Sequence, residues 1–144
     1  MEVFELPEVA EILGLDLAKA KNWSNGRTGL VIEPSVRKAT GTGSRNLFSL
    51  NDLYLFGIAQ ACSKTGFAAA AIGKLVDSLR PKYPDLSRVP ILTLWRPKAG
   101  ERFEITESSK DPDASIWVRL DVPRVCKDIN YRIKKRGPKG APKQ

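Results

Sequence analysis

The segment from residue 43 to residue 53 constrains the fold of this chain more than any other stretch. Its first part is small, basic and turn-prone, as expected at the tip of a β-wing. Its second part places Ser49 three residues before Asp52, the spacing of a capping box that satisfies free backbone amides at a helix start. Leu47 and Phe48 precede the cap and can hold the wing against the helix. The sequence therefore predicts a wing that leads directly into a helix.

Two short helical segments precede the predicted wing and are separated by a glycine-containing turn. Residues 6–13 carry apolar side chains at helical spacing, and Gly14 is suited to end a helix. Asp16 is a good N-cap for a second helix, which we expect to extend to about Ser24. This arrangement is typical of a helix-turn-helix. Three residues of the second helix are expected to face inward: Leu17, Ala20 and Trp23.

Residues 25–48 are predicted to form a two-stranded wing. The segment contains a strand candidate at 30–32 and a glycine-containing tip at 41–43. Its basic residues face a single acidic one, Glu33, and they are Arg27, Arg37, Lys38 and Arg45. The alternative is an ordinary surface loop whose charges only keep the protein soluble.

Two further helices are predicted after the wing. The first begins after Ser49 and ends near Gly66. The second has an apolar stripe over 72–79, and Pro81 is expected to stop it. Residues 81–90 are rich in turn formers and are predicted to be a linker.

The rest of the chain is predicted to contain strands and one more helix. The three strand candidates are 91–95, 102–106 and 115–120, and Asp121 can cap the final helix. These elements predict an α+β fold: a four-helix head with a β-wing over 1–80, the linker over 81–90, a small β-rich segment with a terminal helix over 91–134, and a disordered basic tail over 135–144. We expect the β-rich segment to serve dimerisation.

Charge favours a polyanionic partner, although many basic proteins have other functions. The 144 residues include 24 Lys and Arg against 16 Asp and Glu, which gives a net charge of +8 and an isoelectric point near 9.7. The chain has no histidine, and its two cysteines, Cys62 and Cys126, are far apart in apolar surroundings. His-based catalysis and most zinc sites are therefore excluded, and we expect no enzyme, metal or cofactor. Both cysteines are expected to be small buried apolar residues.

Membrane insertion and export are not expected. No apolar run reaches the roughly 20 residues that span a bilayer. The first five residues are acidic rather than basic, unlike the start of a signal peptide. A cytoplasmic, nucleoid-associated protein is the expectation.

About half of the chain, residues 6–79, resembles the MerR family of bacterial winged helix-turn-helix transcription regulators. The matching pieces are residues 9–15, 21–23, 43–53 and 62–67, followed by Ile72 and Leu75. They occur in the order and spacing of the family's first helix and turn, recognition helix, wing-to-helix element and second helix pair.

The resemblance implies a DNA-binding homodimer, with RNA polymerase as a further partner. On the outer face of the second helix, the residues expected to enter the major groove are Ala18, Lys19, Lys21 and Asn22. The wing residues expected to hold flanking phosphates or the minor groove are Arg27, Arg37, Lys38 and Arg45.

The chain departs from the family pattern at several of these positions. Lys21 stands where the family usually has arginine, and Asn22 stands where it has an aromatic residue. The wing arginine of the family falls on Asn46, and Arg45 lies one place early. The long coiled-coil helix that pairs protomers in the family is also not visible, since Pro81 interrupts the chain at that point.

Two other functions remain open from the sequence. One is an architectural DNA-binding protein, similar to excisionases or terminases, that bends DNA within a larger assembly. The other is a protein-interaction module that keeps the fold without binding DNA. The transcription regulator and the architectural protein should both lose affinity for DNA as salt rises, which distinguishes them from the protein-interaction module.

Overall fold

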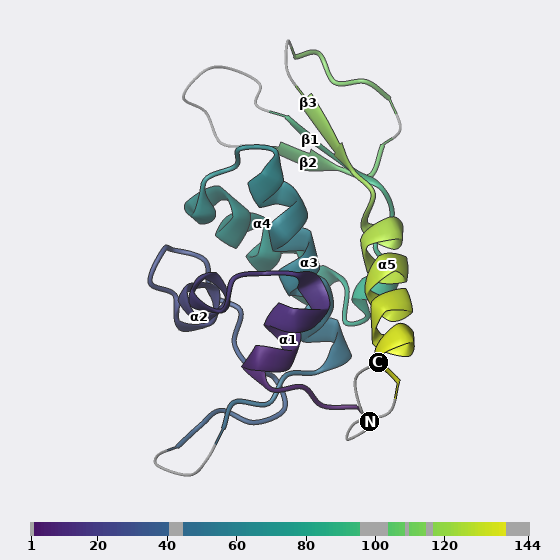
Figure 1. The fold of residues 1–144 in the computed structure, drawn as a ribbon. Helices are drawn as coiled ribbons and strands as arrows, with labels where there is room; N and C mark the ends of the chain where they lie inside the picture. The colour runs from purple at the N-terminus through teal and green to yellow at the C-terminus, as the bar shows by residue number, and fades with distance from the viewer. Residues whose placement is uncertain (1, 41–44, 96–103, 109, 115–116, 138–144) are drawn as a thin grey trace.

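The computed structural model describes residues 2–40, 45–95, 104–108, 110–114 and 117–137, and Figure 1 shows their arrangement. In chain order the elements are α1 (Leu6–Leu13), α2 (Leu17–Asn25), α3 (Leu50–Lys64), α4 (Ala69–Lys82), the 3₁₀ turn η1 (Leu86–Arg88), β1 (Leu92–Trp95), β2 (Glu104–Thr106), β3 (Trp117–Leu120) and α5 (Val122–Arg136). The expected α+β class is confirmed. No helix of the described part is both long enough and apolar enough to cross a bilayer.

The turn between α1 and α2 is built as the sequence predicts. Gly14 ends α1 with a left-handed φ of 62°, which glycine adopts without steric cost. The Asp16 side chain accepts the Ala18 amide at 3.0 Å and so caps α2. Ala20 and Trp23 face inward and are buried. The same prediction is wrong for Leu17, the first residue of α2, which is 38% exposed.

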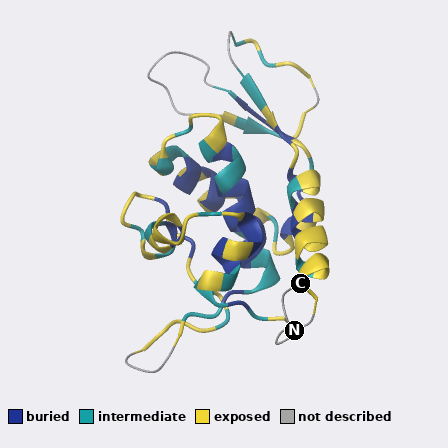
Figure 2. Ribbon diagram, in the orientation of Figure 1, coloured by how far each residue is buried: buried dark blue, intermediate teal, exposed yellow. Residues whose placement is uncertain are grey.

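Helix α3 is the centre of the helical part (Figures 1 and 2), and every residue from 52 to 59 is buried. The predicted capping box of Ser49 and Asp52 is present at its start. Helix α4 packs against α3 through the predicted stripe and extends one residue past Pro81. The helix continues there because the Tyr83 amide still reaches the Leu79 carbonyl, at 2.9 Å.

The three predicted strands form one antiparallel sheet with the order β2-β1-β3. They are shorter than expected, and the parts of the predicted strands at 102–103 and 115–116 lie outside the described residues. Leu92 and Leu94 of β1 and Leu120 of β3 are buried, so one face of the sheet joins the core. Trp95 pairs with Trp117 across the sheet, and both are half-buried.

Helix α5 returns from the sheet to pack against α3, as Figure 1 shows. The Tyr54 hydroxyl donates to Asn130 Oδ1 at 2.6 Å, which joins the two helices directly. Ile129 is buried at the same contact. Leu86 and Val89, within the segment expected to be a linker, are also buried in this core. The division into domains stays a prediction, but these segments share one hydrophobic cluster.

Two local expectations from the sequence are wrong. Residues 30–32 form no strand, although Leu30 and Ile32 are buried and Val31 is 40% exposed. Their alternating burial reflects an extended segment that lacks a partner strand among the described residues. The tail was expected to begin at residue 135, but α5 continues to Arg136, and residues 138–144 lie outside the description.

Gly73 of α4 is in close contact with a backbone segment, which allows a test of this packing. A Cβ at this position would lie 2.7 Å from the carbonyl oxygen of Gly29. Overpacking costs roughly 1–3 kcal/mol, whereas the better helix propensity of alanine offsets about 1 kcal/mol. We therefore expect Gly73→Ala to lower the free energy of unfolding, measured by chemical denaturation, by about 1 kcal/mol or more.

Gly57→Ala in α3 is the matched control, because it makes the same change in a helix. Its Cβ would meet the side-chain ends of Ile129 and Val125, at 2.6 and 2.9 Å, rather than backbone. Side-chain ends can move, so this variant should lose less stability than Gly73→Ala. A Gly73→Ala protein as stable as the wild type would contradict the packing of α4 described here.

Candidate nucleic-acid interface

Helix α2 presents a basic edge whose position is fixed by buried residues on its other side. Ala20 and Trp23 are 0% and 3% exposed, whereas Lys19 and Lys21 are exposed and Asn22 is half-buried. These two buried side chains, about one turn apart, pack the inner face of α2 against the core, so its outer face stays exposed. The expected major-groove residue Ala18 is exposed as well.

The lysines of α2 differ in how they are held. Lys19 Nζ donates to Ser63 Oγ of α3 at 3.3 Å and lies 5.3 Å from the centre of the Trp23 ring. Lys21 makes no hydrogen bond or ion pair with the described residues that would restrain its ammonium group. Lys21 is therefore the more available of the two for a phosphate, while Lys19 has to leave its contacts to reach one.

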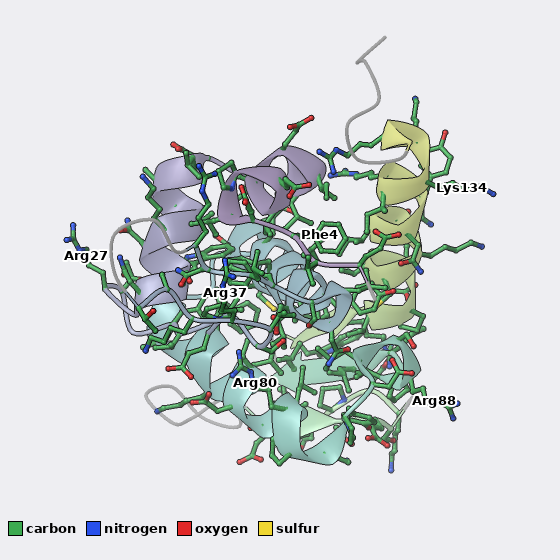
Figure 3. All side chains as sticks on the ribbon, turned by 90° about the horizontal axis from the view of Figure 1, so that it is seen from below. Phe4, Arg27, Arg37, Arg80, Arg88 and Lys134 are labelled. Atoms are coloured by element: carbon green, nitrogen blue, oxygen red, sulfur yellow. The ribbon has the colours of Figure 1, made fainter. Side chains whose placement is uncertain are left out.

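The extended segment that follows α2 returns to lie beside the last turn of that helix. The Ile32 amide donates to the Trp23 carbonyl at 2.8 Å, which places the extended segment beside α2. Arg27 lies in the intervening turn, and its side chain points away from the body of the molecule in Figure 3. Among the described residues, the contact that Arg27 makes is through its backbone amide, which donates to Asn25 Oδ1 at 2.9 Å. The guanidinium of Arg27 is thus displayed on the same side as α2.

A buried carboxylate joins the base of the predicted wing to the start of α3. Asp52 is 4% exposed, and its Oδ2 atom accepts the Ser35 amide at 2.9 Å, the Ser35 hydroxyl at 2.6 Å and the Ser49 amide at 2.9 Å. The positive end of the helix dipole also favours a carboxylate at this place. Asp52 therefore fixes both ends of the hairpin-like segment between Ser35 and Ser49.

This segment closes through backbone hydrogen bonds, and its tip at 41–44 lies outside the described residues. The Leu47 amide donates to the Arg37 carbonyl at 2.7 Å, and the Arg37 amide donates to the Leu47 carbonyl at 3.2 Å. A second bridge, between Phe4 and Phe48, attaches the returning strand to the N-terminal segment. We call residues 35–40 and 45–49 the hairpin.

The cations expected on the hairpin are exposed, but they are not equally free. Arg37 Nε donates to the Arg45 carbonyl at 3.3 Å. Arg45 Nη1 forms an ion pair with Glu5 Oε2 at 2.9 Å, and the arginine side chain is still 69% exposed. Ion pairs this accessible contribute about 1 kcal/mol or less, so a phosphate can replace Glu5. Lys38 is exposed beside them.

Ser35, which we did not single out from the sequence, and Asn46, which we named only as a departure from the family pattern, are structural residues of the hairpin. Asn46 Oδ1 accepts the Ala39 amide at 2.7 Å, across the hairpin. This contact helps to hold the hairpin closed. Ser35 follows Pro34 in a turn. Its role as a partner of Asp52 follows from their contact in space and is not indicated by their spacing in the sequence.

The two cysteines are buried apolar groups rather than reactive thiols. Burial raises the pKa of the Cys62 thiol to about 12 and that of Cys126 to about 11, so both remain protonated at neutral pH. Both are buried, as predicted. Within the described part, no three His, Cys, Asp or Glu side chains come together as a metal site would require.

The structure places α2 and the hairpin on one side of the molecule and α5 on the other (Figure 1). All eight residues expected to contact DNA belong to the α2 and hairpin side: Ala18, Lys19, Lys21, Asn22, Arg27, Arg37, Lys38 and Arg45. Their role in binding stays a prediction. Their shared side, and the exposure of all of them except the half-buried Asn22, are properties that such a role requires.

Sequence comparisons relate part of the chain to transcription regulators. It is 32% identical over 88 residues to a protein of Mycobacterium bovis named an uncharacterised HTH-type transcriptional regulator, and equally to proteins of the same name in two strains of Mycobacterium tuberculosis. The match covers 60% of this chain but only 38% of each relative. No protein-family model matches the chain. The relationship is therefore distant homology to HTH-type regulators and suggests a DNA-binding regulator.

Removing the Asp52 carboxylate should loosen the hairpin and destabilise the protein. Asp52→Ala removes the carboxylate that accepts from the part-buried amides of Ser35 and Ser49, and a hydrogen bond to a charged group contributes about 1.5–3 kcal/mol. We expect the free energy of unfolding in urea to fall by roughly 2 to 4 kcal/mol.

Ser49→Ala is the control, because it removes the helix cap but keeps the carboxylate. Losing such a cap typically costs about 1 kcal/mol. The anchoring role of Asp52 requires a larger loss in Asp52→Ala than in Ser49→Ala. Equal losses would reduce Asp52 to an ordinary capping residue.

Proposed function

We propose that this protein is a sequence-specific transcription regulator of the MerR-like, winged helix-turn-helix type that binds double-stranded DNA. In this proposal α2 enters the major groove, and the hairpin contacts flanking phosphates or the minor groove. The observation that carries it is the Asp52 anchor, which holds the cationic hairpin at the start of α3, on the side of the molecule that α2 occupies. The distant homology to HTH-type regulators supports it independently.

Within α2, we propose that positioning and base readout come from different residues. Lys21 carries a compact charge on a flexible stem, which suits a phosphate better than a planar guanine edge. The amide of Asn22 can form the paired hydrogen bonds that select adenine in the major groove. This division accommodates the departures from the resembled family, because phosphate contacts tolerate them more readily than base contacts.

We further propose that the protein acts as a homodimer whose contact lies in the sheet. The apolar stripe of α5, which belongs to the same C-terminal segment, is covered by α3 and so is not available to pair two chains. The paired and half-buried Trp95 and Trp117 remain as the alternative surface. In the cell such a dimer would act at the nucleoid, with RNA polymerase as a further partner.

An architectural DNA-binding protein is the second candidate function. It is favoured by the separation of basic residues onto two sides of the molecule, with Arg27 and Lys134 pointing in opposite directions in Figure 3. A regulator that reads an operator needs one basic surface, whereas a protein that bends DNA can use basic surfaces on both sides.

A salt titration of duplex binding, with variants of the proposed contacts, tests DNA binding directly. Log affinity should fall by about 0.9 per log unit of salt for each phosphate contact. Lys21→Ala and Arg45→Ala should each weaken binding and flatten this slope by about 0.9. Both side chains are exposed, so the stability of each variant should stay within about 0.5 kcal/mol of the wild type.

Lys110→Ala is the matched control, because Lys110 is equally exposed but lies in the connection between β2 and β3. It should leave the affinity and the slope nearly unchanged. Wild-type binding that does not depend on salt would contradict the proposal and support a protein-interaction module. An equal loss in the control would mean that net charge, rather than this interface, governs binding.

A further inference from the structure

Helix α5 carries a second basic surface that the proposed function does not use. The helix has six basic residues against one acidic residue, Asp128. At helical spacing, one side combines four cations with an exposed tyrosine, and this set, which we call the α5 stripe, consists of Arg124, Lys127, Tyr131, Lys134 and Lys135. All five residues are exposed, Tyr131 by 64%.

The other two arginines of α5 have a structural role, because each makes contacts with another helix. Arg132 Nη1 donates to the Ile12 carbonyl of α1 at 3.2 Å. Arg136 forms ion pairs with Glu8 and Glu11, also of α1, at 3.6 and 3.8 Å. Both therefore attach α5 to α1.

The cations of the α5 stripe make no comparable contacts with the described residues. Lys135 Nζ lies 5.9 Å from the centre of the Tyr131 ring, which keeps it within the stripe. Lys134 points away from the body of the molecule in Figure 3. The cations on this side of α5 are therefore not explained by packing within the fold or by the contact with α1.

The apolar side of α5 is already occupied, which limits what the stripe can bind. Val125 and Ile129 lie against Gly57 of α3, and Cys126 is buried. A basic amphipathic helix binds a membrane surface or a partner's groove by burying its apolar side, and here that side is not available. The stripe can therefore act only through its charges and the tyrosine.

The dimensions of the stripe match a nucleic-acid backbone. Arg124 and Lys135 are eleven residues apart, or about 16 Å along a helix that rises 1.5 Å per residue. A duplex carries one negative charge per roughly 1.7 Å of its axis with both strands counted, so this length of duplex carries about nine phosphate charges in total, of which only those on the near side can meet the stripe. Tyr131 in the middle can donate its hydroxyl to a phosphate oxygen.

We propose that the α5 stripe binds the backbone of a second segment of duplex DNA, so that one chain joins two segments. This inference rests on the proposed function for the first segment, which α2 and the hairpin hold. The two surfaces lie on opposite sides of the molecule, as Figures 1 and 3 agree. A straight duplex in contact with α2 therefore does not reach α5. The second contact reads no sequence, because it involves phosphates alone.

A bridging assay with the full chain tests this proposal. One duplex is fixed to beads, a second duplex carries a fluorescent label, and capture of the label requires a protein that holds both. Lys127→Gln with Lys134→Gln should reduce capture several-fold and leave the affinity for a single operator-containing duplex within about two-fold. The salt slope of capture should fall by about 0.9 for each lysine removed. Tyr131→Ala, which changes no charge, should reduce capture to a lesser degree.

The control pair is Lys74→Gln with Lys110→Gln, which removes the same charge from α4 and from the β2–β3 connection. It should capture the labelled duplex as the wild type does. Sedimentation of every variant checks that the oligomeric state is unchanged, since a dimer can also bridge duplexes through its two α2 surfaces.

The outcomes separate this inference from the proposed function. Unchanged capture by the α5 variant overturns the inference and leaves an acidic protein as the partner of the stripe. Equal loss in the control pair also overturns it, because net charge would then explain the capture. A wild-type chain that binds no duplex at all refutes the proposed function itself.

Discussion

The buried carboxylate of Asp52 is the interaction on which the proposed interface depends. One oxygen atom accepts hydrogen bonds from Ser35, where the hairpin begins, and from Ser49, where it ends. Burial without such partners would be costly for a charged group, so the carboxylate and the hairpin require each other. Since Asp52 lies in the first turn of α3 and completes its capping box, the hairpin is attached to a helix that is buried from residue 52 to residue 59. This attachment fixes where the hairpin cations lie relative to α3.

Helix α3 also couples the interface to the C-terminal part of the chain. Its Tyr54 bonds Asn130 of α5, and α5 in turn holds α1 through the contact between Arg132 and the Ile12 carbonyl. A fragment that ends near residue 80 would expose the face of α3 that Ile129 covers. The C-terminal helix is thus part of the core that supports α2, in addition to carrying the α5 stripe.

Local signals in the sequence predicted much of the fold. The capping box at Ser49, the glycine at position 14 and the apolar stripe of α4 each act within a few residues, so spacing is sufficient to recognise them. The outward position of Lys21 followed in the same way from the inward positions of Ala20 and Trp23.

Contacts between distant residues could not be predicted in this manner. Tyr54 and Asn130 are 76 positions apart, and Arg132 and Ile12 are 120 apart. The apolar side of α5 packs on α3, a partner distant in sequence that local spacing does not reveal. The alternation at 30–32 suggested a strand for a related reason, since burial of every second residue does not require a neighbouring strand.

Selection of bound sequences from random duplex DNA, with the purified full chain, tests the central claim most directly. If α2 reads the major groove in a homodimer, the selected sequences should share an inverted repeat with half-sites about 10 base pairs apart, or a multiple of that spacing. Direct repeats would retain the DNA-binding surface and favour the architectural function. Selection that yields no shared motif, even at low salt, would contradict the claim that this surface recognises a DNA sequence.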